Sequence, residues 1–338
     1  MIYIRADMNG VIATGHVMRC LAVADAARDM GEETTFLLAD GEATALLEKR
    51  GYRYHILNTS WKDMEGELPA LRKVIEEQGI HTLLIDSYQV TKKYLTELGK
   101  LVRTVYIDDV NAFHYPVSAL ICYANYYATF KYEENYAAEQ LFLGTDYVPL
   151  RAVYADCPQK RIAEVVENLL VMSGGTDQYD ILSHILRAVQ GRNYRRIEVV
   201  CGAYYKNYDG LCKAYAGCEN VVIRRNVSDL ETSMQRADLA ITAGGSTMYE
   251  LCACGTPALS YSFADNQLGN VVQFQRDQVI DYIGDVRYVD VPDELLKLLD
   301  RYDRDAELRR QRSEKMRRVV DGKGAARIAR ILMEEGRR

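Results

Sequence analysis

The sequence predicts an α/β protein made of two successive arrays of alternating strands and helices. Short apolar runs alternate with segments of helical periodicity along most of the 338 residues. This alternation restarts once, in the second half of the chain, with a new strand that leads into a glycine-rich turn. Because strands that alternate with helices favour a mostly parallel sheet covered on both faces, we expect two such sheets in tandem.

The first array is predicted from six apolar runs and four helical segments. Three of the helices are followed by a glycine (Gly31, Gly51 or Gly79), which is a typical C-terminal stop. The tyrosine-rich stretch 123–136 is expected to be a partly buried irregular connection, or else an aromatic platform beside a bound ring. The expected strands are Ile2–Ala6, Thr34–Ala39, Tyr52–Leu57, Thr82–Asp86, Arg103–Asp108 and Leu120–Tyr123, and the expected helices are Val17–Met30, Ala43–Lys49, Leu68–Glu77 and Lys92–Leu98.

The second array begins with the apolar run in "VENLLVMSGG" and continues through "RRIEVVCG", "NVVIRR", "DLAITAGG" and "PALSYSF". Between the two arrays, the stretch from Gly144 to Arg161 contains Pro149 and Pro158 and little periodicity, so we place the domain junction there. We therefore expect an N-terminal domain over residues 1–150 and a C-terminal domain over residues 151–338.

Composition and charge narrow the class of protein. A hydrophobic content of 48% with 27% charged residues is typical of a globular protein, and the net charge of -6 gives no reason to expect a nucleic-acid partner. No apolar stretch approaches the roughly 18 residues of a membrane span, and no signal peptide is visible. The eight cysteines are scattered without metal-binding spacing, so we expect reduced thiols in a cytoplasmic protein.

The stretch "RADMNGVIATGH" joins the first strand to the first helix and places Gly15 and His16 at the helix start. It is neither a Walker loop nor a Gly-x-Gly-x-x-Gly turn, so it is weak evidence for phosphate binding. At a helix N-terminus the dipole disfavours the imidazolium form, so His16 would be a neutral base, or simply a residue that caps the helix. Arg19, one turn further on, would meet an anion or pair with Asp7.

Two further glycine turns follow strands of the second array, in "MSGGTD" and "ITAGGSTMYEL". Adjacent glycines let backbone N–H groups approach a ligand, and Ser246 can cap the next helix or donate to a phosphate oxygen. A capping box between Thr247 and Glu250 would explain both residues without a ligand. The expected nucleotide-binding residues are Gly174, Gly175, Thr176, Gly244, Gly245, Ser246, Thr247 and Glu250.

Other polar residues follow strands in "IDSY", "IDD" and "DNQ": Asp86, Tyr88, Asp109, Asn266 and Gln267. Ligands of open α/β sheets collect beyond the carboxyl ends of the strands, although carboxylates there are often helix caps. No cluster has metal-ligand spacing and no Gly-x-Ser-x-Gly elbow is present, so we expect no metal and no cofactor.

The motifs together resemble one known family. "IRADMNGVIATGHVMRCLAVA", "LLIDSY", "YIDD", "LGTDYVPLR", "MSGGTD", "ITAGGSTMYEL", "DNQ" and "DGKGAARIA" look like the motifs of the UDP-2,4-diacetamido-2,4,6-trideoxy-β-L-altropyranose hydrolases of pseudaminic acid biosynthesis. The resemblance covers nearly the whole chain; "DMNGV" departs from it, because small serine-like residues are more usual there. It implies the GT-B fold of MurG-type glycosyltransferases, in which two Rossmann-like domains face each other across a cleft.

The resemblance also implies roles for residues of each domain. The second domain would bind UDP, and the first would supply the catalytic residues His16, Asp86 and Tyr88. His16 matches the histidine that positions or activates the attacking water, Tyr88 matches the aromatic residue beside the sugar, and Asn266 and Gln267 match the pair near the sugar and phosphates. The expected substrate-binding residues are Arg5, Asp7, Gly15, Arg19, Asp109, Asn266 and Gln267.

The expected activity is hydrolysis of a UDP-linked diacetamido-trideoxy sugar at the anomeric C–O bond, with inversion. A MurG-like glycosyltransferase is the first alternative, because the glycine turns of the second half do not separate water from an acceptor hydroxyl. A nucleotide-sugar-binding protein without turnover is the second alternative. Besides the UDP-sugar, enzymes of the same sugar pathway are possible partners.

Overall fold

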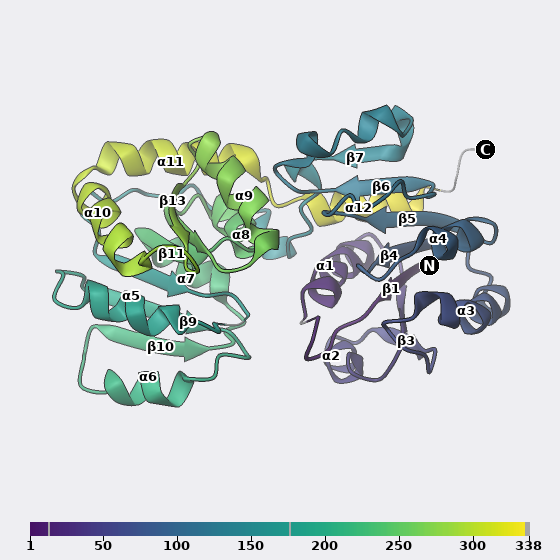
Figure 1. Cartoon of the computed structure of the whole chain (residues 1–338), viewed down its shortest axis with the longest axis horizontal. Coiled ribbons are helices and arrows are strands. Elements are labelled where there is room, and N and C mark those ends of the chain that lie inside the picture. Colours follow the sequence, from purple (N-terminus) through teal and green to yellow (C-terminus); the bar gives the residue numbers. More distant parts are fainter. Residues whose placement is uncertain (13, 176, 335–338) are drawn as a thin grey trace. The chain divides into compact units, whose positions relative to one another are not determined.

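Helices and parallel strands form two compact units in this computed structural model, which describes residues 1–12, 14–175 and 177–334 (Figure 1). Unit 1 comprises Met1–Ala152 together with the residues from Gly322 onward. Unit 2 comprises Val153–Asp321. Each unit contains its own sheet, so the predicted tandem α/β architecture is confirmed.

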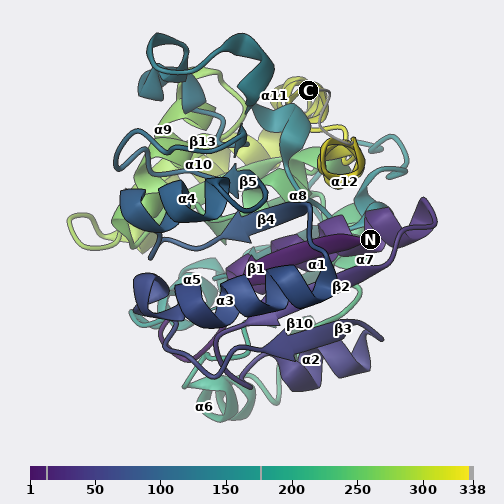
Figure 2. The ribbon, with the colours of Figure 1, turned by 90° about the vertical axis from the view of Figure 1, so that its right-hand side faces the viewer.

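Unit 1 is built on a seven-stranded parallel sheet of order β3-β2-β1-β4-β5-β6-β7. Figure 2 shows strands β3, β2, β1, β4 and β5 in this sequence across the unit. The strands are β1 (Ile2–Ala6), β2 (Thr34–Leu38), β3 (Arg53–Ile56), β4 (Thr82–Asp86), β5 (Arg103–Ile107), β6 (Ala119–Cys122) and β7 (Leu141–Leu143). The helices are α1 (Gly15–Asp29), α2 (Thr44–Lys49), α3 (Met64–Gln78), α4 (Lys92–Gly99) and α12 (Gly324–Met333).

Both faces of this sheet are covered. All five residues of β1 are buried, as expected for a central strand between two helix layers. Helices α3 and α4 pack together over a core that includes Tyr3, Leu83 and Ile85, while α1 packs against α12. The stretch 123–136 is irregular, with two 3₁₀ turns, as expected. The sequence analysis missed β7, which is only three residues long.

The last helix corrects the expected domain boundary. Residues from Gly322 onward were assigned to the C-terminal domain, but α12 packs on α1 and β4 of unit 1. Arg103 donates to the carbonyl oxygen of Ile331 at 2.9 Å, which fixes the end of the helix. A Cβ on Gly324 would lie 2.2 Å from the carbonyl oxygen of Val148, so the helix start requires glycine for this close approach.

Unit 2 is built on a six-stranded parallel sheet of order β10-β9-β8-β11-β12-β13. Helix α8 packs against α7 and α11, and α10 packs against α5. The strands are β8 (Asn168–Met172), β9 (Arg196–Cys201), β10 (Val221–Arg225), β11 (Leu239–Ala243), β12 (Ala258–Ser262) and β13 (Asp281–Asp285). The helices are α5 (Ile181–Val189), α6 (Tyr208–Ala214), α7 (Leu230–Arg236), α8 (Thr247–Cys254), α9 (Asp265–Arg276), α10 (Val291–Arg304) and α11 (Ala306–Val319).

Candidate active site

The strand order of unit 1 brings residues from distant parts of the sequence to one place. Strands β1 and β4 are neighbours, and the chain proceeds outward from them in opposite directions. Connections that diverge in this way leave a crevice beyond the carboxyl ends of the two strands, where open α/β sheets bind ligands. His16 follows β1 at the start of α1, Asp86 is the last residue of β4, and Tyr88 follows it.

His16 and Asp86 form a buried dyad. The Nδ1 atom of His16 lies 2.7 Å from Oδ1 of Asp86, and only 7% of the histidine side chain is exposed. Two facing lone pairs would repel at this distance, so we assign the proton to Nδ1, which donates to the carboxylate. Nη2 of Arg19 lies 2.9 Å from the same Nδ1, and both nitrogens then share Oδ1 of Asp86 as their acceptor. In that tautomer Nε2 has a free lone pair, and Nε2 has no hydrogen-bond partner among the residues that the structure describes.

Arg19 fixes the carboxylate of this dyad. Its Nε and Nη2 donate to the two oxygens of Asp86, and its Nη1 donates to the hydroxyl of Tyr123 at 2.6 Å. Burial alone would raise the pKa of Asp86, but the charge of Arg19 and the contact with His16 outweigh burial and hold that pKa well below its usual range. Arg19 therefore pairs with Asp86, and not with Asp7 as one alternative had it.

Tyr88 and Asp109 complete the group. The ring of Tyr88 meets the His16 ring edge-on, with centroids 4.7 Å apart, and its hydroxyl donates to Oδ2 of Asp109 at 3.0 Å. Burial raises the pKa of Tyr88, so the phenol stays protonated and remains a donor. Tyr88 is 44% exposed, and a Cβ on Gly15 would meet no atom within 4 Å. Space is therefore open next to the dyad.

Two expected substrate-binding residues lie elsewhere and have structural roles. Arg5 is completely buried, donates with Nε and Nη2 to Glu67, and donates with Nη1 to Asp7 at 2.6 Å. Asp7 also accepts from the backbone N–H of Ala39 at 2.8 Å. Arg5 lies on β1 and Asp7 directly follows it, and both side chains are buried with their charges paired. Contact of Arg5 and Asp7 with substrate stays a prediction.

In unit 2, β8 and β11 are the neighbouring strands from which the connections diverge, so their glycine turns lie at the corresponding place. The N–H of Gly244 donates to Tyr261 at 2.8 Å, and a Cβ there would lie 2.1 Å from a methyl carbon of Val271. Gly244 is thus a packing residue. The N–H groups of Gly245 and of the two residues after it have no partner among the described residues.

The first turn of α8 does not form the capping box. Ser246 occupies the N-cap position, is exposed, and makes no side-chain cap hydrogen bond, while Thr247 is the first helical residue. Glu250 lies one turn into the helix and is partly exposed. The helix start therefore keeps its donors and hydroxyls available for an anion.

The turn after β8 is tight. Gly174 has a φ of 79°, which favours glycine, and a Cβ on Gly202 would lie 2.1 Å from the Gly174 carbonyl oxygen. A Cβ on Gly175 would meet no atom within 4 Å. Asp177 caps α5 by accepting from the N–H groups of Ile181 and Leu182, each at 2.9 Å. Thr176 lies outside the described residues.

Asn266 and Gln267, the expected ligand-binding pair at the start of α9, have different surroundings. Gln267 accepts from the backbone N–H of Phe263 at 3.0 Å and so holds the helix start. Asn266 is exposed, which leaves it able to contact a ligand.

Sequence reasoning missed two residues of the unit 1 site. Tyr123 supports Arg19, and Cys20 lies with its Sγ 3.5 Å from Oδ2 of Asp86. Tyr123 is the first residue of the tyrosine-rich stretch 123–136, and this composition was the one feature of the sequence that pointed to it. Cys20 follows Arg19 directly, but only the fold shows that it faces the β4 carboxylate.

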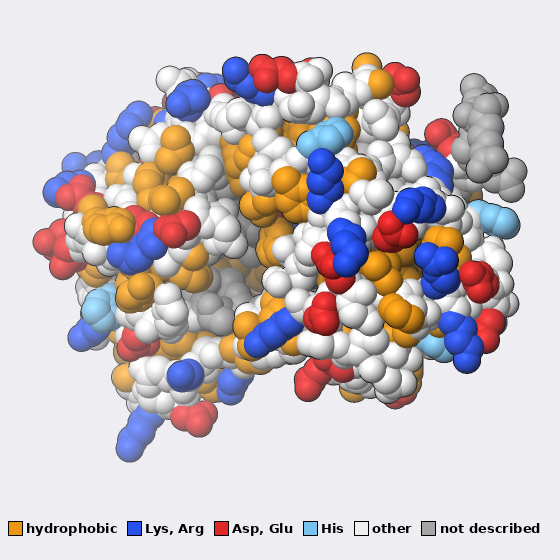
Figure 3. Space-filling model, turned by 45° about the vertical axis from the view of Figure 1, so that its right-hand side comes forward, with side chains coloured by type: hydrophobic (Ala, Val, Ile, Leu, Met, Phe, Trp, Pro, Cys, Tyr) orange, Lys and Arg blue, Asp and Glu red, His pale blue; other side chains and the backbone are white. Residues whose placement is uncertain are grey.

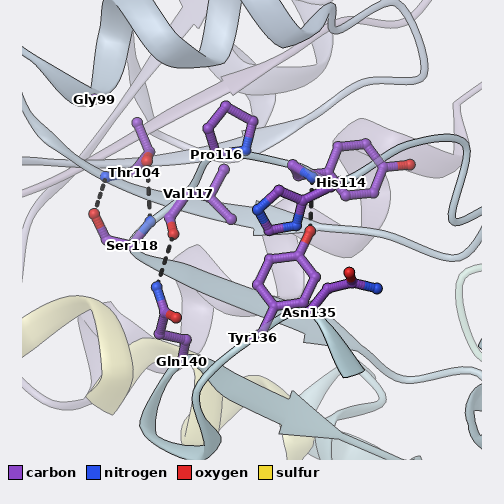
Figure 4. A pocket seen from close by; sticks show the side chains of 10 residues that line it. Gly99, Thr104, His114, Pro116, Val117, Ser118, Asn135, Tyr136 and Gln140 are labelled. Carbon is purple, nitrogen blue, oxygen red and sulfur yellow. Dashed lines mark hydrogen bonds between the residues drawn. The ribbon is translucent and has the colours of Figure 1, made fainter. Parts of the chain in front are cut away.

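A separate hollow of about 380 Å³ lies in unit 1 near the amino ends of β5 and β6, away from the dyad (Figure 4). Its polar groups already pair with one another: Gln140 donates to the Val117 carbonyl at 3.2 Å, and the Tyr115 N–H donates to Tyr136 at 2.7 Å. On the side of unit 1 seen in Figure 3, acidic and basic side chains are intermixed.

Within residues 1–12, 14–175 and 177–334, no group of three or more His, Cys, Asp or Glu residues is placed to hold a metal ion. Over the same ranges, no helix has the length and apolar character needed to cross a membrane.

Comparison with known proteins places the chain among GT-B folds. A MurG from Acinetobacter baumannii superposes with a TM-score of 0.75 at 12% identity, covering 99% of both chains. The predicted GT-B fold, with two Rossmann-like units in tandem, is thereby confirmed. No family model matches the chain.

Two curated relatives match by sequence. An uncharacterised protein of Methanocaldococcus jannaschii is 21% identical over 272 residues, which are 76% of this chain and 54% of that protein. The spore coat polysaccharide biosynthesis protein SpsG of Bacillus subtilis is 25% identical over 202 residues, 58% of each chain. The chain thus spans just over half the length of these relatives.

Proposed function

We propose that the chain hydrolyses a UDP-linked 2,4-diacetamido-2,4,6-trideoxy sugar at the anomeric C–O bond with inversion, and releases UDP and the free sugar. The observation that carries this proposal is the His16–Asp86 dyad with its free Nε2, at the place where open α/β sheets generally bind ligands. The motif resemblance supports the substrate class, and the relative named for polysaccharide biosynthesis supports carbohydrate chemistry.

The proposed chemistry is a single displacement by water. Nε2 of His16 accepts a proton from water while its oxygen bonds to the anomeric carbon, and the bond to the phosphate oxygen breaks with its electron pair leaving on UDP. A positioned base of this kind contributes about 10² to 10⁴ in rate. Asp86 accepts from Nδ1 throughout, which stabilises the imidazolium as it forms.

Unit 2 supplies the site for the leaving diphosphate in this proposal. The unpartnered N–H groups of Gly245, Ser246 and Thr247 open α8, and the positive end of its dipole favours an anion. Gly244 is excluded from this role because its N–H is already bonded within the sheet.

The test is incubation of the purified chain with UDP- and CMP-linked amino sugars in ¹⁸O-labelled water, without an acceptor. We expect release of UDP and of a sugar that carries the label at its anomeric hydroxyl. Label in UDP would refute attack at carbon. His16→Gln should lower turnover by about 10² to 10⁴. His184→Gln, at an exposed histidine of α5, is the matched control and should leave turnover unchanged.

A glycosyltransferase with an apolar acceptor is the second candidate. Two valines in the loops that carry site residues are strongly exposed, Val11 at 76% and Val110 at 51%. Exposed aliphatic side chains in these loops are compatible with an apolar acceptor alcohol. UDP release that requires an added acceptor would favour this candidate over hydrolysis.

A further inference from the structure

Two cysteines of unit 2 meet although they lie 97 residues apart in the sequence. The sulfur atoms of Cys157 and Cys254 are 3.5 Å apart. Cys157 lies in the segment where the chain enters unit 2, and Cys254 is the last residue of α8. Buried cysteines commonly act as small apolar residues, but such packing does not require two sulfurs to face each other.

A single arginine holds both backbones in place. Arg317 on α11 donates from Nη2 to the carbonyl oxygen of Cys157 at 3.1 Å. Its Nη1 donates to the carbonyl oxygens of Pro158 and Ala253, at 3.1 and 3.3 Å. The backbone beside each thiol is therefore hydrogen-bonded to the same guanidinium, which keeps the two cysteines next to each other.

The surroundings make the two thiols chemically unequal. The hydrogen bond with Cys254 lowers the pKa of Cys157 and outweighs burial, and Arg317 adds to the lowering. The same hydrogen bond, together with burial, raises the pKa of Cys254. Cys252, two residues earlier on α8, has its pKa raised by burial alone. Cys157 is also the more exposed of the two, at 9% against 0% for Cys254, so it is the thiol that a small reagent reaches first.

We propose that Cys157 and Cys254 form a redox modification site that takes a hydroperoxide as its co-reactant and closes to a reversible disulfide. The Cys157 thiolate attacks the outer peroxide oxygen, the O–O bond breaks, and hydroxide or alkoxide leaves, so that Cys157 becomes a sulfenic acid. The Cys254 sulfur then attacks the Cys157 sulfur and releases water, with loss of the Cys254 proton. Two thiols lose two electrons and two protons in total, and the peroxide is reduced.

The disulfide requires a modest movement. A sulfur–sulfur bond is about 2.05 Å long, so the sulfurs must approach by about 1.5 Å. The bond would tie the first residues of unit 2 to the C-terminal end of α8, the helix whose first turn carries the unpartnered N–H groups. This inference does not depend on the hydrolase proposal.

The experiment uses the full chain with Cys212→Ser and Cys218→Ser, because these two thiols are more accessible. Reduced protein is treated with one equivalent of hydrogen peroxide, quenched with N-ethylmaleimide and digested without reductant for mass spectrometry. We expect a cross-linked peptide pair that contains residues 157 and 254, has lost two hydrogens, and disappears on reduction. We also expect the disulfide to raise the thermal unfolding midpoint.

Matched variants locate the bond. Cys157→Ala and Cys254→Ala should each abolish the cross-link, and Cys252→Ala should leave it intact. A cross-link through Cys252, or oxidation of Cys157 to sulfinic acid without a cross-link in the parent protein, would overturn the proposal. The protein with only Cys212→Ser and Cys218→Ser still shows whether the cross-link forms, even where an alanine variant fails to fold.

Discussion

Replacing Asp86 by asparagine tests how His16, the proposed base, is oriented. In the native chain, Oδ1 of Asp86 accepts from both His16 and Arg19, and Oδ2 accepts from Arg19. An amide has only one acceptor oxygen, so its NH₂ group must face an arginine donor in either orientation. With its oxygen toward His16, the amide keeps the tautomer but sets NH₂ against Nε of Arg19. With NH₂ toward His16, it forces the proton onto Nε2, and this is the orientation that the prediction assumes.

The size of the effect follows from this geometry. With Nε2 protonated, the ring has no lone pair for water, and the contribution of the base, about 10² to 10⁴ in rate, is lost. The affinity for UDP should not change, because the unpartnered donors proposed for the diphosphate belong to unit 2. We therefore expect Asp86→Asn to lower kcat by about 10² to 10⁴ with an unchanged Kd for UDP.

The assay is UDP release under single-turnover conditions, with calorimetric titration of UDP on the same samples. Asp63→Asn is the matched control, because it makes the same substitution at the exposed N-cap of α3. There the Asp63 side chain accepts from the N–H of Gly66 at 2.9 Å. A value of kcat within threefold of the native one would refute the dyad as the base. A parallel loss of UDP affinity would instead indicate that the substitution disturbs folding.

The remaining predictions concern stability. The pKa of Asp86 is lower in the folded protein than the unfolded value of about 3.9. Its ionised form therefore stabilises the fold above that pH, and this stabilisation is lost as pH falls toward the folded-state pKa. Asp86→Asn lacks this term, so its free energy of unfolding should fall less steeply with pH below pH ~4, as measured by circular dichroism. Gly244→Ala should destabilise unit 2 by about 1–3 kcal/mol through overlap with α9, whereas Gly245→Ala should leave the urea midpoint within error. Arg5→Met should cost about 3–5 kcal/mol in urea unfolding, because it strands the buried Glu67 carboxylate; a native-like midpoint would show that the pair is dispensable.

The sequence predicted the fold well because its signals were local. The apolar runs predicted the first and last residues of β1 and β4 correctly. Both are central strands whose residues are all, or nearly all, buried. Strand β7 has three partly buried residues and too little pattern to be recognised. Helix α12 was recognised as part of the C-terminal region, but its choice of neighbour depends on surface shape and not on periodicity.

The site was predicted in part for the same reason. His16, Asp86 and Tyr88 each follow a strand, and the parallel sheet brings such positions together. Arg5 and Asp7 were expected to contact substrate because they belong to the first motif, and the sequence did not show that Arg5 has a buried partner. That partner, Glu67, comes from α3, about sixty residues away, and no local pattern links the two.

The return of the last helix to unit 1 has a consequence for synthesis. Helix α12 buries Ile328, Ala329, Ile331 and Leu332 against elements that are synthesised well before it. N-terminal domains usually fold first during translation. Here one helix layer of the unit 1 sheet stays incomplete until Gly324–Met333 has been synthesised, while all of unit 2 is already available to fold. A nascent chain released before Gly322 would therefore expose the α1 side of unit 1, which makes late truncation more damaging to the beginning of this protein than to its middle.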